Sequence, residues 1–266
     1  MLKEILNHLP ESCPWQDSIL YFDTIDSTNT RAKELAAQGA PHGTVLIANH
    51  QTGGRGRMGR TFVSPAGSGI YLSVILRPNC PPTELMHLTC ASAVAMCDAV
   101  EHAAHFRPGI KWTNDLVWQS KKLGGILTEL GIRPDGITDY AIVGIGINCC
   151  QEADDFPPEI RTMATSLRAI SPKNVDRAQV AAAMIESLYA MAQSLLTGKE
   201  PMMNHYRQDC ITLGKEVSLT TADGTIRYGK ALSLDDDGGL VVRFNNGQVE
   251  TVAFGEISVR GMYGYA

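Results

Sequence analysis

Apolar residues recur along the chain with two different periods, and the change between them divides the sequence in two. As far as residue 212, apolar runs of strand length alternate with longer segments in which apolar residues recur three or four positions apart. After residue 213, short strand-like runs follow one another between glycine-rich turns. The pattern predicts an α+β domain over residues 1–212 and a small β-barrel domain over residues 213–266.

In the first domain, the apolar runs predict the strands of a central sheet, and the helical periodicity predicts helices that flank it. The strands are expected at residues 18–24, 45–49, 69–76, 122–130 and 139–148, with short extended pieces at 110–112 and 115–118. The helices are expected at residues 30–38, 83–104, 176–196 and 202–210. In the second domain, strands are expected at residues 216–220, 226–234, 240–244 and 249–254.

Charge and cysteine content limit the classes of function. A net charge of −5 argues against a general nucleic-acid-binding surface. No apolar run has the length of a membrane span, and the N-terminus lacks the apolar core of a signal peptide. The seven cysteines, without a C-x-x-C pair, are typical of reduced thiols in a cytoplasmic protein. The histidines are scattered without a nearby set of carboxylates or cysteines, so no dedicated metal site is expected.

The most distinctive stretch is Gln51–Arg60, which holds four glycines and three arginines in ten residues, after the apolar run Val45–Ala48. Glycine lets the backbone approach a ligand closely, and arginine offers a planar, permanently charged donor. The stretch predicts a cationic loop around an anionic ligand, although a loop of this composition is as often a solvated surface loop. We expect residues 53–65 to be mobile without ligand and ordered with it.

Two common phosphate-binding motifs do not explain this loop. Gly54–Gly59 has the spacing G-x-G-x-x-G of a dinucleotide-binding turn. Such a turn opens a helix and has an acidic residue about 20 positions later. Here Thr61–Gly67 is no helix start, and residues 79–82 carry no carboxylate. The P-loop pattern G-x-x-x-x-G-K-[ST] is absent as well.

Four further stretches carry polar groups that a ligand could use. Asp26–Asn29 offers helix caps and spare hydroxyl and amide groups, and Lys111–Leu116 places an amide and a carboxylate on a tight turn. Lys121–Glu129 starts a strand with a cation and continues through two glycines, and Gly144–Asn148 repeats the glycines and ends on an amide. Each stretch alone is typical of ordinary structure, but their combination in one domain indicates a ligand site.

Taken in order, these stretches resemble the biotin–protein ligases. The resemblance is carried by Asp26–Asn29, Gly54–Arg60, Lys111–Asp115, Lys122–Leu127 and Gly144–Asn148, and by the closing Gly255–Arg260. It covers about residues 18–262. The resemblance implies an α+β fold with a mixed central sheet flanked by helices, of the class II synthetase-like biotinyl/lipoyl ligase type, and an SH3-like C-terminal barrel.

The resemblance also implies a two-step reaction. Biotin and Mg-ATP first form biotinyl-5′-AMP and pyrophosphate, and a lysine of a biotin carboxyl carrier protein domain then attacks the mixed anhydride. Joining a carboxylate to a triphosphate brings anions together, so cations must stabilise the charge that develops at the α-phosphate. Arg57 and Lys122 are suited to this step. Mg²⁺ would arrive with the ATP, without a metal site of the protein.

Position by position, the resemblance implies three overlapping groups of site residues. The biotin-binding residues would be Ser27, Thr28, Asn29, Gln51, Arg55, Gly56, Arg57 and Lys122. The ATP- or adenylate-binding residues would be Arg55, Arg57, Arg60, Phe62, Asn114, Lys122 and Asn148. The catalytic residues would be Lys122, Arg57 and Asp115. Among these, Asp115 would orient the incoming lysine, Phe62 would cover the adenine, and Asn148 would lie near the phosphates and Mg²⁺.

The chain departs from the family pattern at three places. Thr113 stands where the family usually has proline, which frees a backbone N–H and is expected to loosen the turn. Met58 replaces a residue that is often basic or polar. Bifunctional members carry an N-terminal helix-turn-helix domain, for which residues 1–17 are too few, so we expect no specific DNA binding. Members of the family often form homodimers through their central sheet.

Two other functions are compatible with these residues. A lipoate–protein ligase has a related fold and the same adenylation chemistry, and it would use lipoate in place of biotin. A non-catalytic biotin-binding regulator would bind its ligand without forming an adenylate and would not need Lys122. The Gly/Arg loop and the C-terminal barrel favour biotin, and the loop cations together with Lys122 favour an enzyme.

Overall fold

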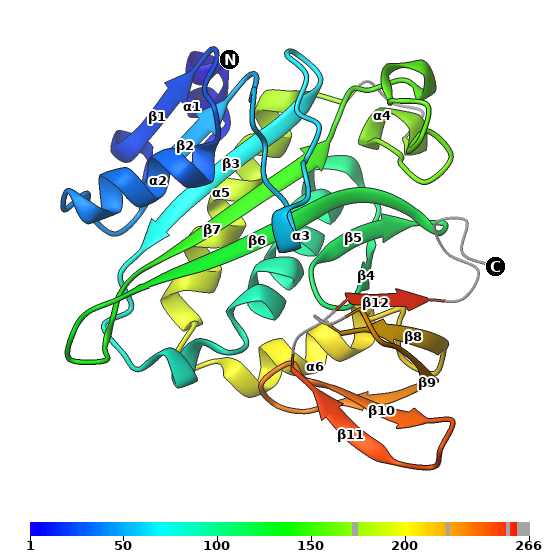
Figure 1. The fold of residues 1–266 in the computed structure, drawn as a ribbon. Coiled ribbons are helices and arrows are strands. Elements are labelled where there is room, and N and C mark those ends of the chain that lie inside the picture. The colour runs from blue at the N-terminus through cyan, green and yellow to red at the C-terminus, as the bar shows by residue number, and fades with distance from the viewer. Residues whose placement is uncertain (172–174, 222–223, 254–255, 260–266) are drawn as a thin grey trace.

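A computed structural model describes residues 1–171, 175–221, 224–253 and 256–259, the last four by their backbone (Figure 1). Within these residues the chain forms a seven-stranded sheet and a five-stranded sheet. Figure 1 shows helices packed on the larger sheet and the smaller sheet below it, at the end of the chain. The expected α+β fold is confirmed.

The larger sheet occupies the first part of the chain. Its strands are β1 (Ile19–Phe22), β2 (Thr44–Ala48), β3 (Gly69–Leu76), β4 (Gly109–Lys111), β5 (Asp115–Trp118), β6 (Lys121–Ile132) and β7 (Thr138–Asn148). Their order in the sheet is β1-β2-β3-β7-β6-β5-β4. The β1–β2 pair is parallel and the other neighbours are antiparallel, so the sheet is mixed as expected.

The helices cover the two faces of this sheet unequally. The α-helices are α1 (Leu2–His8), α2 (Thr28–Ala37), α3 (Leu88–Ala104), α4 (Leu167–Ile170), α5 (Arg177–Ser194) and α6 (Lys199–Asp209). Helix α2 packs on β2, β3 and β7 on one face, and α3 and α5 pack together on the other. The main core lies under α3 and α5. A smaller core under α2 contains Ala32, Ala36, Leu46, Ile75 and Ile142.

Capping side chains explain where two of the helices begin. The Ser27 side chain accepts a hydrogen bond from the Thr30 N–H at the start of α2, and Asp176 accepts one from the Ala178 N–H at the start of α5. The helix expected at residues 83–104 begins later than residue 83. Pro82–Leu85 forms a separate 3₁₀ turn, and α3 begins at Leu88. Helices α1 and α4 were not expected from the sequence.

The smaller sheet is antiparallel and follows α6. Its strands are β8 (Glu216–Thr220), β9 (Ile226–Leu234), β10 (Leu240–Phe244), β11 (Val249–Val252) and β12 (Glu256–Val259), in the order β11-β10-β9-β8-β12. Four of these strands were expected. The closing stretch Gly255–Arg260 includes β12, whereas Gly255 and Arg260 lie outside the described residues. Buried residues of β8, β9 and β10 are continuous with the main core.

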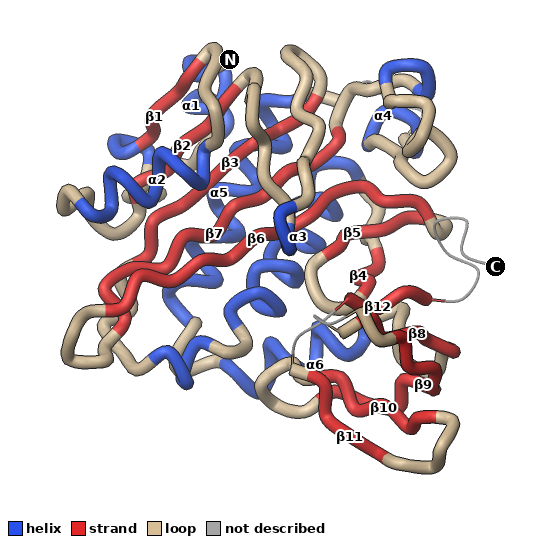
Figure 2. The backbone as a smooth tube through the Cα atoms, viewed as in Figure 1, coloured by secondary structure: helices blue, strands red, loops and turns tan. Residues whose placement is uncertain are grey.

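A long connection between β2 and β3 lies on the α2 side of the sheet. Figure 2 shows this loop crossing in front of β7 and β6, with the short 3₁₀ turn η2 (Arg57–Gly59) at its tip. It contains the whole Gly/Arg stretch. The other 3₁₀ turns of the described residues are η1 (Gln16–Ser18), η3 (Pro82–Leu85) and η4 (Ala153–Asp155). Among the helices of the described residues, none has the length and apolar character that crossing a membrane requires.

Candidate active site

Glycines hollow the face of the sheet that lies below the Gly/Arg loop. Gly125 of β6 pairs with Gly146 of β7, and Gly144 lies two positions away on the same face. A Cβ on Gly146 would lie 2.5 Å from the Phe62 ring, and a Cβ on Gly144 would overlap the Asn29 side chain. The glycines therefore form a trough into which side chains of α2 and of the loop reach.

A buried network of hydroxyl and amide groups occupies one end of the trough, at the N-terminus of α2. Gln51 Oε1 accepts hydrogen bonds from the Thr28 backbone N–H at 2.8 Å and from the Thr28 hydroxyl at 3.1 Å. Gln51 Nε2 donates to Ser64 Oγ at 2.9 Å. Ser73 Oγ lies 2.6 Å from Asn29 Oδ1 and 2.8 Å from Thr28 Oγ1. This end offers hydrogen bonds without net charge, which suits a neutral polar group.

The Gly/Arg loop folds back on itself above the trough. The Phe62 N–H donates to the Gly54 carbonyl at 2.9 Å, and the Gly56 N–H donates to the Arg60 carbonyl at 2.7 Å. A Cβ on Gly54 would overlap the Phe62 carbonyl oxygen, so this close approach of two backbone segments requires glycine. The fold of the loop places its arginine side chains over the sheet.

Tyr71 supports the outgoing arm of the loop from below. Its hydroxyl donates to the Pro65 carbonyl at 3.0 Å, and its ring meets the Phe62 ring edge-on with the centroids 6.4 Å apart. Burial raises the pKa of Tyr71 to about 12, so the hydroxyl stays protonated and keeps this bond at neutral pH. Phe62 is thereby held between the glycine trough and Tyr71.

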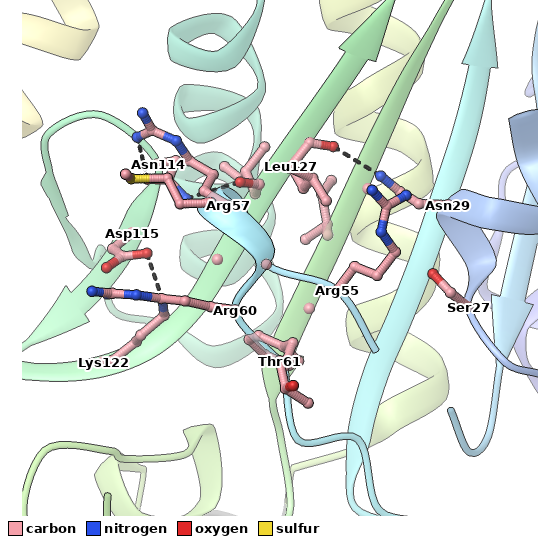
Figure 3. A pocket seen from close by; sticks show the side chains of 18 of the residues that line it. Ser27, Asn29, Arg55, Arg57, Arg60, Thr61, Asn114, Asp115, Lys122 and Leu127 are labelled. Carbon is pink, nitrogen blue, oxygen red and sulfur yellow. Dashed lines mark hydrogen bonds and ion pairs between the residues drawn. The ribbon is translucent and has the colours of Figure 1, made fainter. Parts of the chain in front are cut away.

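Cations and their partners occupy the other end of the trough. Lys122 Nζ lies 2.6 Å from Asp115 Oδ1, and Arg57 Nη1 donates to Asn114 Oδ1 at 2.9 Å. The Lys122 side chain is 37% exposed and that of Asp115 is 15% exposed. Figure 3 shows the Arg60 side chain running from the loop toward Asp115 and Lys122. The predicted catalytic residues Arg57, Asp115 and Lys122 thus lie at the same end of the pocket.

Lys111 is a further cation at this end, for which the sequence indicated no role. Its side chain is 8% exposed, it lines the pocket, and it pairs with Asp115 across the β4–β5 hairpin. The sequence did contain a signal for this position. Lys111 and Asp115 flank a tight turn, and residues that pair across a hairpin face the same side.

The β4–β5 turn is fixed from two directions. Asn114 Nδ2 donates to the Ile126 carbonyl at 2.9 Å, and the Ile126 N–H donates to the Asn114 carbonyl at 3.0 Å. The Trp112 indole Nε1 donates to the carbonyl of Gly238, in the turn between β9 and β10 of the smaller sheet, at 2.8 Å. The peptide bond between Trp112 and Thr113 is cis. The hydrogen bonds with Ile126 and Gly238 hold the turn that carries Asn114.

Asn148 is the predicted site residue that does not line the pocket in the described structure. Its side chain is buried, its Nδ2 donates to the Thr165 carbonyl at 3.0 Å, and the same atom lies 3.5 Å from the Lys122 carbonyl. Gln151 Nε2 lies 3.4 Å from Asn148 Oδ1. Asn148 thus ties the start of β6 to the segment before α4.

The remaining predicted residues come together in one pocket. The predicted residues that line it are Ser27, Thr28, Asn29, Gln51, Arg55, Gly56, Arg57, Arg60, Phe62, Asn114, Asp115 and Lys122. Its other lining residues are Met58, Thr61, Lys111, Trp112, Gly125, Ile126, Leu127, Gly144, Ile145 and Gly146. Most of this second group come from β6 and β7, and Trp112, Leu127 and Gly144 stand in stretches that carry the resemblance. That Gly125, Gly144 and Gly146 face the pocket together follows from the register between the two strands.

The charge of the pocket is uneven along its length. The network of Thr28 and Gln51 is neutral, and Arg55 beside it is paired with the Glu129 carboxylate at 3.1 Å. Arg57, Lys111 and Lys122 line the opposite end. Among the described lining residues, Asp115 is the one carboxylate, and the described residues hold no group of three or more His, Cys, Asp or Glu that could bind a metal ion. The pocket suits an elongated ligand with a neutral polar end and an anionic end.

Two family profiles match the chain. Residues 21–148 match the biotin/lipoate A/B protein ligase family, and residues 212–260 match the biotin protein ligase C-terminal domain. The second match covers the smaller sheet, which is the SH3-like barrel that the resemblance implied.

Known proteins are similar over most of the chain. The bifunctional ligase/repressor BirA of Bacillus spizizenii is 40% identical over 230 residues, which are 86% of this chain and 70% of that protein. The biotin–[acetyl-CoA-carboxylase] ligase of Mycobacterium tuberculosis is 32% identical over 236 residues, 87% of this chain and 85% of that protein.

A solved structure agrees with these relatives. The biotin protein ligase from Aquifex aeolicus, in complex with biotin and ATP, superposes with a TM-score of 0.76 at 31% identity. The superposition covers 91% of this chain and 98% of that one. With its glycine-lined trough, its Gly/Arg loop and its C-terminal barrel, the chain belongs to the biotin protein ligase family.

Proposed function

We propose that this protein activates biotin with ATP as biotinyl-5′-AMP and transfers the biotinyl group to a lysine of a biotin carboxyl carrier domain. The observation that carries the proposal is the uneven charge of the pocket, with a neutral network at Thr28 and Gln51 and cations at Arg57 and Lys122. Biotin has a neutral ureido ring at one end and a carboxylate at the other. Membership of the family and the names of the relatives support the same reaction.

The first step joins two anions. A carboxylate oxygen of biotin attacks the α-phosphorus of ATP, the bond from that phosphorus to the bridging oxygen breaks, and pyrophosphate leaves. Negative charge grows on the α-phosphate oxygens during the attack. Lys122, held 2.6 Å from Asp115, and Arg57, held 2.9 Å from Asn114, supply cations that are already in position.

The second step uses a nucleophile from the partner protein. The acceptor lysine loses one proton to water, and its neutral amine nitrogen then attacks the biotinyl carbonyl carbon. The bond to the AMP oxygen breaks, AMP leaves with the bonding electron pair, and the amide nitrogen loses its second proton to water. The Asp115 carboxylate, at the cationic end of the pocket, attracts the ammonium form of that lysine and orients it. No nucleophilic serine or cysteine of this chain takes part.

The other assignments follow the two ends of the pocket. Ser27, Thr28, Asn29 and Gln51 would hydrogen-bond the ureido ring, and Arg60, Phe62 and Asn114 would contact the adenylate. Asn148 contacts the backbone carbonyls of Lys122 and Thr165. These contacts favour a role in positioning Lys122 over direct contact with phosphate.

The remaining parts of the proposal concern the metal, the partners and the compartment. Mg²⁺ would enter on the phosphates of ATP, because that ion prefers phosphate and water oxygens. The carrier domain is the macromolecular partner, and specific duplex DNA is not, which a gel shift would check. The seven cysteines carry free thiols, which supports a cytoplasmic location.

An ATP–pyrophosphate exchange assay tests the first step. We expect biotin-dependent exchange in the wild type and a loss of about 10²–10³-fold in Arg57→Ala and in Lys122→Ala, the size measured for removal of one transition-state donor. Lys230→Ala removes an exposed lysine of β9 that does not line the pocket, and this variant should exchange like the wild type.

The identity of the acid separates the alternatives. Exchange that requires lipoate in place of biotin would make the chain a lipoate ligase. Biotin binding without any exchange would make it a non-catalytic regulator. Transfer of biotin to a carrier domain, and its absence when the acceptor lysine of that domain is changed to arginine, tests the second step.

A further inference from the structure

Glu129 is a partly buried carboxylate that binds donors through both of its oxygens. Its Oε1 lies 3.0 Å from Lys33 Nζ. Its Oε2 accepts hydrogen bonds from Asn29 Nδ2 at 3.0 Å and from Arg55 Nη1 at 3.1 Å. The Glu129 side chain is 19% exposed, so the three contacts are only partly screened by solvent. The sequence placed this residue in a strand and indicated no role for it.

The position of Glu129 connects three elements that build the pocket. It follows Leu127, a lining residue, by two positions on β6, so both side chains face the same side of the sheet. Asn29 and Lys33 belong to α2, and Arg55 belongs to the Gly/Arg loop. One carboxylate therefore holds the sheet, the helix and the loop together at the neutral end of the pocket.

The contact with Glu129 determines how the Asn29 amide is oriented. A side-chain amide has two N–H donors and one oxygen with two lone pairs. The two donors of Asn29 serve the Leu127 carbonyl at 3.2 Å and Glu129 at 3.0 Å, and its oxygen lies 2.6 Å from Ser73 Oγ. The amide oxygen thus faces the hydroxyl network, with one lone pair remaining for a ligand.

The charge of Glu129 is maintained by its neighbours. Burial tends to raise the pKa of its carboxyl, but hydrogen bonds from Lys33 and Asn29 and the positive charges of Arg55 and Lys33 lower it below the ordinary value of 4.5. The carboxylate is therefore ionised at neutral pH and can hold Arg55 through a charge-assisted hydrogen bond. Figure 3 shows Arg55 beside Asn29, at the opposite end from Lys122.

We propose that Glu129 is a positioning residue with two effects. It fixes the Gly/Arg loop over the pocket through Arg55, and it fixes the direction in which the Asn29 amide points its N–H groups. In this arrangement Arg55 acts through its bond to Glu129, and Arg57 and Lys122 meet the anionic end of the ligand. The effect on biotin rests on the proposed function, whereas the effect on the loop does not.

Trypsin tests the effect on the loop without any ligand, because it cleaves after Arg57 and Arg60. Glu129→Gln keeps the shape of the side chain and removes its charge. We expect the initial rate of cleavage at these two bonds to rise by about fivefold, the size expected for the loss of one partly exposed ion pair. Mass spectrometry of the first fragments identifies the bonds, and thermal unfolding checks that the variant remains folded.

Matched variants distinguish this role from a general loosening of the structure around the loop. Lys33→Met removes the other ion pair of the same carboxylate but no contact of the loop, so cleavage in the loop should stay at the wild-type rate. Arg55→Gln removes the Arg55–Glu129 ion pair from the side of the loop, and the Arg55 side chain is 41% exposed. This variant should raise cleavage after Arg57 and Arg60 as Glu129→Gln does. This variant also provides the test if Glu129→Gln does not fold.

The double variant shows whether the two residues act through each other. If Glu129 acts through Arg55, Glu129→Gln combined with Arg55→Gln should be cleaved no faster than either single variant. Unchanged cleavage in the folded single variants, or an equal rise in Lys33→Met, would overturn the proposal for the loop.

Steady-state exchange tests the effect on the ligand. We expect Glu129→Gln to raise KM for biotin by about fivefold and to change kcat by less than about twofold, because the residue acts on binding groups and does not touch the reacting atoms. Lys33→Met should leave both constants unchanged. An unchanged KM would overturn the role in ligand binding. Absence of exchange in the wild type would refute the proposed function and leave the protease result intact.

Discussion

The Asn29 side chain occupies the space directly above Gly144, where the side chain of any other residue at position 144 would lie. A Cβ on Gly144 would overlap the Asn29 amide oxygen, which itself lies 2.6 Å from Ser73 Oγ on the next strand. Ser73, Gly144 and Leu127 form one row across β3, β7 and β6, because Gly144 pairs with Ser73 on one side and with Leu127 on the other. The absence of a side chain in the middle of this row is what lets an α2 side chain enter the pocket.

Gly144→Ala should therefore weaken biotin binding. The added methyl group must displace Asn29, and displacement breaks a buried hydrogen-bond network whose loss costs about 1–3 kcal/mol. We expect Kd for biotin, measured by calorimetry, to rise by about tenfold or more.

The control for this variant lies two residues earlier on the same strand. Ile142→Val removes one methyl group from the small core under α2 and should cost about 0.5–1.5 kcal/mol of stability without changing Kd. If Gly144→Ala binds biotin like the wild type, Asn29 and Gly144 do not share the space in the way the structure shows.

The pair of Lys122 and Asp115 allows the two steps of the reaction to be separated. The Asp115 carboxylate is expected to act on the incoming ammonium group, which is present only in the second step. In Asp115→Asn, we expect transfer from preformed biotinyl-5′-AMP to a carrier domain to fall by about 10²-fold, because misplacing a reacting group by about 1 Å can cost this much. Pyrophosphate exchange should fall by less than about tenfold.

The control for that experiment is Asp139→Asn. Asp139 pairs with Arg77 at 3.1 Å on the far part of the sheet, outside the described lining of the pocket. It should behave like the wild type in both assays. A loss of exchange in Asp115→Asn as large as the loss of transfer would show that Asp115 acts mainly by holding Lys122.

Much of the fold could be predicted because its signals are local. The strand at Gly69–Leu76 was expected with the limits that the structure shows, since its run of apolar residues is buried at every position. Helix caps were expected within Asp26–Asn29, and the structure shows that Ser27 is the residue of this stretch that caps α2. Helix α1, with Ile5 in the core, was not expected, because it is only seven residues long and its stability comes from packing on α5.

The residues of the site could be predicted where they belong to a sequence motif, but their arrangement in space could not. Gly125, Gly144 and Gly146 stood in recognisable stretches, but their common face follows from the register of β6 on β7, which local sequence does not encode. Glu129 was overlooked for the same reason. The mobility of the loop, the domain boundary at residues 212–213, the binding of Mg²⁺ and the homodimer stay predictions.

The bond between Trp112 and Gly238 predicts that the barrel supports the active-site turn. Gly238 has a φ of 88°, its carbonyl accepts the Trp112 indole N–H, and a Cβ there would lie 2.6 Å from Cys90 Sγ. Gly238→Ala combines backbone strain with this clash, so we expect it to lower the free energy of unfolding by about 2–4 kcal/mol. Urea unfolding measures the change.

Gly247→Ala isolates the strain from the clash. Gly247 has a φ of 86° with no atom within 4 Å of a Cβ position, so this variant should lose only about 1–2 kcal/mol. If the barrel turn supports the site, Gly238→Ala should also reduce pyrophosphate exchange at temperatures where it is folded, whereas Gly247→Ala should not. Equal effects of the two variants on stability and exchange would contradict the support by the barrel.

His87, next to the start of α3, makes the stability of the fold sensitive to mildly acidic pH. Its Nε2 lies 2.9 Å from the Leu195 carbonyl, and its Nδ1 has no hydrogen-bond partner among the described residues. Burial lowers the pKa of this imidazole below its ordinary value of 6.5. Protonation would place a second N–H in a buried position without an acceptor.

The direction of the pH effect follows from this lowered pKa. Above pH 6.5 the ring is neutral in the folded and in the unfolded chain, and the fold has its full stability. As the pH falls below that value, the unfolded chain takes up a proton that the folded chain resists, so the free energy of unfolding decreases by at most about 1.4 kcal/mol per pH unit for this group. His87→Gln should be less stable at pH 7.5, but its free energy of unfolding in urea should decrease less steeply between pH 6.5 and 5.5.

His102→Gln, at an exposed position of α3, is the control and should retain the wild-type slope. A slope in His87→Gln as steep as that of the wild type would assign the acid sensitivity to other groups.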